Sequence, residues 1–295
     1  MAVDITAARA FMTTHARLLD RHRFDLLLGE GSADAALHAL GGYRNSDGGY
    51  GWGLEPDLRS PESQTSSALH AFEVFADVAP RTSPDAVALC DWLQSVTLPG
   101  GGLPFALPLT DATGSAPHWA DAEPEPASLQ ITAIVAAMAH QVAAHDRAVA
   151  RHPWLAGATA YCLQAVTDWE GSIHAIELAF AVQLLDAVRD QHAEAGALLD
   201  KLGRHIPDSG VVPVTGGSEG ESMRPLDFAP LPDRPARRLV TAAAVDADLT
   251  RLADGQQPDG GWLVDFSAYS PAASLDWRGY ATVSAVTTLR ANGLL

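Results

Sequence analysis

Lysine and cysteine are scarce in this sequence of 295 residues. Lys201 is the single lysine, so arginine carries nearly all of the positive charge and almost no amine is present for Schiff-base chemistry. The two cysteines, Cys90 and Cys162, stand in apolar helical stretches and form no CxxC pair. They are therefore predicted to be reduced core residues in a reducing compartment.

Long apolar runs are also missing. No stretch approaches the roughly 20 apolar residues that a transmembrane helix needs. Residues 1–24 lack the apolar core and the cleavage site of a secretory signal. We therefore expect a cytoplasmic protein without a transmembrane segment.

Basic residues are outnumbered, because 36 aspartates and glutamates face 19 lysines and arginines, for a formal net charge of −17. Such a charge repels nucleic-acid phosphates and anionic lipid surfaces, so neither is an expected partner. The rest of the composition, 47% apolar residues with abundant alanine and few β-branched runs, is typical of a globular helical protein.

Glycine-rich turns recur along the chain at regular spacing. They are DGGYGWG at 47–53, GGGLPF at 100–105, DSGVVPV at 208–214 and DGGWLVD at 259–265. Gly49 and Gly101 are 52 positions apart, Gly210 and Gly261 are 51 apart, and the middle interval of 109 is about twice that period. We assign the missing middle turn to DWEGSIH at 168–174. The period indicates a stacked array of similar units.

The segments between the turns have helical periodicity. In residues 63–78, Ala68, Phe72 and Phe75 recur at spacings of four and three, as one face of an α-helix requires. The next segment begins with Ser83 as its N-cap. The predicted helices are 4–19, 32–43, 63–78, 83–96, 125–145, 152–169, 172–188, 191–206, 242–257 and 274–293.

Helix pairs that cannot cover their apolar faces within one unit must stack on neighbouring units. Neither end of the sequence has a polar capping repeat, so we expect the array to close on itself. The predicted fold is all-α, a single α/α toroid (α6–α6 barrel) over residues 1–295. Its inner and outer helix rings surround a cavity that holds a small-molecule ligand. A proline-rich irregular segment at about 215–240 is a candidate lid over that cavity.

Two of the glycine turns resemble those of a known superfamily. ADGQQPDGGWLVDF at 253–266 resembles the QW repeat of the terpenoid cyclase and protein prenyltransferase superfamily. Residues 43–72, from YRNSDGGYGWG to SALHAF, resemble the corresponding repeat of prenyltransferase β subunits. The resemblance implies an α6–α6 barrel whose cavity holds an isoprenoid or another substrate.

The chain departs from that superfamily in its chemistry. The Asp-x-Asp-Asp acid motif of squalene-type cyclases is absent, and neither cysteine stands where a prenyltransferase zinc ligand would be expected. We therefore expect no metal and no cofactor, and neither well-known activity transfers directly.

Polar residues that closely follow a glycine turn are expected at the mouth of the cavity, near inner-helix N-termini. Asp57, Asp276 and Glu55 are the candidate catalytic acids, because paired carboxylates with separated pKa values can protonate an alkene or a glycosidic oxygen. The candidate substrate-binding residues are Trp52, Arg59, Gln64, His118, Trp119, Asp121, His174, Glu177, Arg224, Asp265, Tyr269, Trp277, Arg278 and Tyr280. N-capping, salt bridging and ordinary packing are their alternative roles.

Three functions remain open. The first is a terpenoid-cyclase-like enzyme that performs acid-initiated cyclisation or isomerisation of a small isoprenoid, with Trp119, Trp277 and Tyr280 facing the carbocation. The second is a non-catalytic toroid that binds a small molecule or a protein, which a fully salt-bridged cavity would favour. The third is a carbohydrate-active α/α-barrel hydrolase or lyase with two carboxylates. His70 is expected to be a packing or surface residue, and the oligomeric state is left open.

Overall fold

The computed structural model describes residues 3–295, and it is almost entirely helical, which confirms the all-α prediction. The longer helices are α1 (Ile5–His15), α2 (Leu18–Leu27), α3 (Ala33–Gly41), α4 (Thr65–Asp77), α5 (Pro84–Val96), α7 (Leu129–Ala143), α9 (Pro153–Asp168), α10 (Ala175–Val188), α11 (Ala195–Gly203), α13 (Ala242–Asp254) and α14 (Pro271–Ala291). The short elements are α6 (Pro117–Ala120), α8 (Arg147–Ala150), α12 (Pro225–Phe228), the 3₁₀ helix η1 (Pro235–Leu239) and the strands β1 (Val212–Pro213) and β2 (Ser222–Met223).

Several helices begin at the serines that the sequence offers as caps. Ser83, Ser128 and Ser270 each accept a hydrogen bond from a backbone N–H in the first turn of the helix that follows. Such a bond satisfies one of the donors that the start of a helix leaves without a partner. Local sequence chemistry therefore sets these boundaries.

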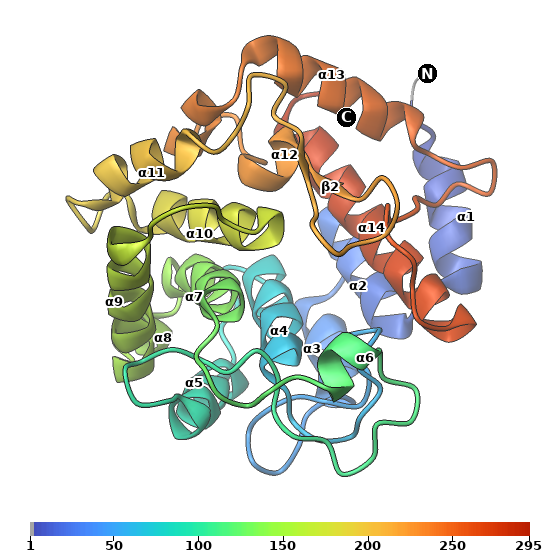
Figure 1. The fold of residues 1–295 in the computed structure, drawn as a ribbon. Helices are drawn as coiled ribbons and strands as arrows, with labels where there is room; N and C mark the ends of the chain where they lie inside the picture. The colour runs from blue at the N-terminus through green and yellow to red at the C-terminus, as the bar shows by residue number, and fades with distance from the viewer. Residues whose placement is uncertain (1–2) are drawn as a thin grey trace.

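The helices contact one another in a circuit. α2 packs on α4, α4 on α7, α7 on α10 and α10 on α12; α12 then packs on α13, α13 on α14 and α14 on α2. Other helices flank this series, with α3 against α2, α9 against α7 and α11 against α10 (Figure 1). The first helix, α1, packs beside the last one, α14.

Alanine-rich helices form much of the core. α7 buries most of its residues on nearly all sides, among them Ala133, Val135 and Ala136. Small side chains let neighbouring helices approach closely, and larger ones such as Phe72 and Trp154, whose rings stack at 6.1 Å, fill the space between them.

The first and last glycine turns both press their backbones against a helix. Gly48 has φ +94°, and a Cβ there would lie 2.9 Å from the carbonyl oxygen of Ala88 in α5. Gly260 has φ +95°, and a Cβ there would lie 2.1 Å from the carbonyl oxygen of Ala7 in α1. Only glycine fits at such distances and torsions. The two similar motifs are thus packing turns, and the second joins the end of the chain to its first helix.

The N-terminal helix differs from its prediction. The single helix expected at 4–19 is two helices, since α1 ends at His15 and α2 begins at Leu18. The sequence pattern hides α2 because its buried face contains Asp20 and Arg23 beside Leu19 and Phe24, so the apolar period is broken.

The proline-rich segment is not wholly irregular, because it contains α12 and η1. Within the described part of the chain, no helix has both the length and the apolar character needed to cross a membrane. Cys90 and Cys162 are buried free thiols.

Candidate functional site

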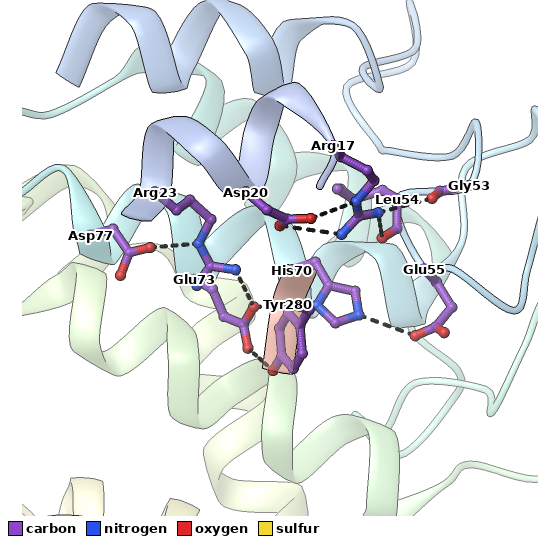
Figure 2. A network of polar contacts seen from close by, with 10 residues as sticks. All are labelled: Arg17, Asp20, Arg23, Gly53, Leu54, Glu55, His70, Glu73, Asp77 and Tyr280. Carbon is purple, nitrogen blue, oxygen red and sulfur yellow. Dashed lines mark hydrogen bonds and ion pairs between the residues drawn. The ribbon is translucent and has the colours of Figure 1, made fainter. Parts of the chain in front are cut away.

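Charged and aromatic side chains from α2, α4, α14 and the loop between α3 and α4 meet inside the helical array (Figure 2). We call this group the central polar cluster. Its members are Arg17, Asp20, Arg23, Glu55, Asp57, Arg59, His70, Glu73, Asp77, Asp276, Trp277 and Tyr280.

His70 lies between two carboxylates. Its Nε2 is 3.1 Å from Glu55 Oε2, and its Nδ1 is 3.2 Å from Glu73 Oε2. To donate a hydrogen bond to each of two carboxylates, both ring nitrogens must carry hydrogen, so this geometry requires an imidazolium. The ring also meets Trp277 and Tyr280 nearly edge-on, with centroids 6.0 and 5.2 Å away.

The pKa values agree with that assignment. Burial by itself would lower the pKa of His70, but its hydrogen bonds to Glu55 and Glu73 raise it to about 9. Burial would likewise raise the pKa of Glu73, but Arg23 and His70 lower it to about 2. The row is therefore a charged carboxylate–imidazolium–carboxylate arrangement at neutral pH.

Arg23 continues the row toward the other end of α4. It contacts Glu73 at 3.3 Å and Asp77 at 2.6 Å, and its guanidinium lies 5.7 Å from the centroid of the Tyr280 ring. The Tyr280 hydroxyl donates to Glu73 Oε1 at 2.7 Å. Burial and the neighbouring Glu73 raise the pKa of Tyr280 well above its usual value, so the phenol remains a donor.

Arg17 ties the loop after the first glycine turn to α2. It forms an ion pair with Asp20 at 2.8 Å and donates to the carbonyl oxygens of Gly53 and Leu54 (Figure 2). Asp20 is fully buried, and this pairing compensates its charge. The loop that carries Glu55 is thereby held in place.

Asp57 is fixed by donors from the far end of the chain. The indole N–H of Trp277 donates to Asp57 Oδ2 at 2.7 Å, and the backbone N–H of Tyr269 donates to Oδ1 at 2.7 Å. Asp57 is 5% exposed. Both carboxylate oxygens are thus held by hydrogen bonds, as expected of an ionised group.

Asp276 stands at the edge of the cluster, paired with Arg59 at 2.5 Å. Burial raises the pKa of Asp276, while the guanidiniums of Arg17 and Arg59 act against that rise. The net effect is a raised pKa for Asp276, which makes this carboxyl a candidate proton donor.

The other residues predicted near the first two turns lie outside the cluster. Gln64 exchanges two hydrogen bonds with the backbone of Leu107. Trp52 is 57% exposed and donates to Asn45 on the surface. The remaining three sit on or beside α6: Trp119 is buried against Phe105, whereas His118 and Asp121 are exposed.

The remaining predicted residues are also separate from the cluster. His174 contacts the carbonyl oxygen of Thr215, and Arg224 pairs with Asp265, so both belong to the surroundings of the β1–β2 hairpin. Glu177 is partly buried on α10, and burial raises its pKa. Arg278 forms an ion pair at 2.7 Å with Asp259 in the last glycine turn, and not with a carboxylate of the cluster.

Sequence reasoning missed six members of the cluster: Arg17, Asp20, Arg23, His70, Glu73 and Asp77. His70 was expected to be a packing or surface residue, and it is instead the residue that joins the two carboxylates. The sequence did offer a signal: His70, Glu73 and Asp77 are spaced by three and four, and all other residues of α4 from Ala68 onward are apolar.

Two surface hollows, of about 350 and 480 Å³, lie away from the cluster, one beside Trp52 and the other between α5 and α8. No group of three or more His, Cys, Asp or Glu among residues 3–295 is arranged to hold a metal ion. No protein-family model matches the chain, and no curated protein does so either.

Proposed function

We propose that the helices form a closed α/α toroid. Two findings support this: the circuit of contacts from α2 through α14 returns to α2, and the last glycine turn packs on α1 as the first packs on α5. The central polar cluster then lies where helices of the inner ring face one another, which is a common position for ligand sites in helical folds.

We further propose that the cluster is the active site of a terpenoid-cyclase-like enzyme, in which acid starts the cyclisation or isomerisation of a small isoprenoid. The observation that carries this proposal is the charge of the cluster. The cluster holds six carboxyl groups and four cations. While Asp276 is protonated, five carboxylates remain, and one negative charge is in excess beside the rings of Trp277 and Tyr280. Negative charge and aromatic rings both stabilise a carbocation.

Asp276 is the proposed proton donor. Its carboxyl O–H breaks, the proton bonds to one alkene carbon, and the electron pair of the alkene leaves a carbocation on the other carbon. Arg59 holds the carboxylate that remains. A second alkene attacks the cation in cyclisation, or the cation persists in isomerisation. Loss of a proton from an adjacent carbon to Asp276 then forms the product alkene and restores the acid.

A non-catalytic binding function is the second candidate, and a specific observation favours it. Both oxygens of Asp57 are occupied, Asp276 is paired with Arg59, and His70 is held on two sides. A cluster whose charged groups already have partners supports structure and ligand binding without requiring chemistry.

One experiment separates the two candidates. Wild-type protein and the variants Asp276→Asn and Asp259→Asn are incubated with C10 and C15 isoprenoids, and products are identified by gas chromatography and mass spectrometry. We expect product from the wild type and from Asp259→Asn, which alters an ion pair outside the cluster, and a loss of about 100-fold or more in Asp276→Asn. No product from the wild type would refute the enzyme and leave the non-catalytic function.

A further inference from the structure

Two neighbouring buried hydroxyls on α4, those of Ser66 and Ser67, have no partner. Ser66 is 3% exposed, and its Oγ makes no hydrogen bond. A buried polar group without a partner costs on the order of 1–3 kcal/mol, so such groups are rare in folded proteins. The hydroxyl of Ser66 therefore has an unused capacity to bind a polar atom.

Ser66 shares the helix face that builds the cluster. It stands four, seven and eleven positions before His70, Glu73 and Asp77 on α4, and these spacings bring residues onto one side of a helix. It lies one turn closer than His70 to the N-terminus of α4, the end from which the loop carrying Glu55 enters. The unpartnered hydroxyl thus extends the row of charged groups along α4.

Each cation of the cluster already has a carboxyl partner. Arg17 is paired with Asp20, Arg59 with Asp276, and Arg23 with two carboxylates. The single lysine, Lys201, donates to backbone carbonyls of α9 instead. With carboxylates in excess, a diphosphate would meet repulsion and no unpaired partner.

We infer that the isoprenoid bound at this cluster has a neutral hydroxyl head, and that Ser66 is the residue that hydrogen-bonds it. This inference rests on the proposed function, which identifies the site. It adds the substrate class to that proposal, namely isoprenoid alcohols rather than diphosphates. The hydroxyl of the ligand accepts one hydrogen bond from the Ser66 hydroxyl or donates one to Ser66 Oγ. The hydrocarbon chain of the ligand lies against the aromatic rings.

The test measures binding alone, by equilibrium dialysis of the full chain against geraniol, geranyl diphosphate and the hydrocarbon myrcene. Ser66→Ala is compared with Ser67→Ala, which removes an equally buried, unpartnered hydroxyl that points roughly 100° away around α4. We expect geraniol to bind at least tenfold more tightly than geranyl diphosphate. Ser66→Ala should weaken geraniol about fivefold to tenfold and leave myrcene unchanged, and Ser67→Ala should change neither.

Three outcomes would overturn the inference: tighter binding of the diphosphate, geraniol affinity that is equal in Ser66→Ala and wild type, or no binding of any probe. Thermal unfolding of both variants shows whether each is folded, and if Ser66→Ala is not, Ser66→Gly is used with the same expectations. The failure of the proposed chemistry is a different result. If geraniol binds through Ser66 but no product forms, the inference stands and the proposed catalysis is refuted. If the diphosphate is converted to product, the proposed catalysis stands and the inference is refuted.

Discussion

Trp277 donates its indole N–H to Asp57 at 2.7 Å, across 220 positions of sequence. The bond joins the loop after the first glycine turn to the last helix. The acceptor, Asp57, is buried. Because a buried carboxylate depends on its donors, this bond, together with the backbone N–H of Tyr269 and the Arg59–Asp276 pair, joins two distant parts of the chain.

Trp277→Phe should therefore destabilise the protein by about 1.5–3 kcal/mol, since it removes a hydrogen bond to a charged group and keeps most of the ring. The matched control is Trp262→Phe, which removes an indole bond of the same length to the backbone carbonyl of Leu252. The control should cost about 1 kcal/mol. Urea unfolding measures both, and equal losses would show that the charge of Asp57 is not important.

His70→Gln should cost about 3–5 kcal/mol, because it leaves Glu55 and Glu73 buried without their shared cation. His140→Gln is the control, since His140 bonds only to Thr159 and its pKa is lowered to about 4 by burial, so it is neutral. The control should lose about 1 kcal/mol. A similar loss in both variants would contradict a charged role for His70.

The stability of the wild type should fall as the pH rises from about 6.5 to 9. The folded pKa of His70, about 9, lies above its usual value of 6.5, so its contribution is complete below pH 6.5 and is lost through pH 9. The pKa of Glu73, about 2, lies below 4.5, so its contribution is lost in acid instead. Urea midpoints at several pH values should show the alkaline fall in the wild type and not in His70→Gln.

Gly260→Ala should destabilise the protein by more than about 3 kcal/mol, because a methyl group there meets the carbonyl oxygen of Ala7 at 2.1 Å. Gly216→Ala is the control: Gly216 also has positive φ, +78°, but no atom lies within 4 Å of the added carbon. The control should cost about 1–2 kcal/mol for the backbone torsion alone. If the two variants unfold at the same urea concentration, the packing of the last turn on α1 is unimportant.

Trypsin should cleave the segment 215–240 after Arg237 or Arg238, since proline follows both Arg224 and Arg234 and blocks cleavage there. Geraniol should protect the segment if it covers the cluster. The turn of the β1–β2 hairpin lies in this segment and contacts two other parts of the chain, because Thr215 contacts His174 and Ser218 accepts from the backbone of Ser267. Mass spectrometry of the fragments locates the cuts. Cleavage that is unchanged at saturating geraniol would refute the lid.

The helical content and most helix boundaries could be predicted from the sequence, because caps such as Ser83 and apolar periods such as that of Phe72 and Phe75 are local signals. The sequence also pointed to Glu55, Asp57, Asp276, Trp277 and Tyr280, since each follows a glycine turn. What it could not supply was their partners.

Those partners were decided only by the tertiary structure. Arg23 and Asp20 lie on α2, whose polar buried face breaks the apolar period, and His70 resembles any polar residue on a helix until Glu55 is folded against it. A buried charge is tolerated only when a partner from elsewhere in the chain compensates it. Local patterns therefore determined the helices and the turns, and long-range packing determined which of their charges form one cluster.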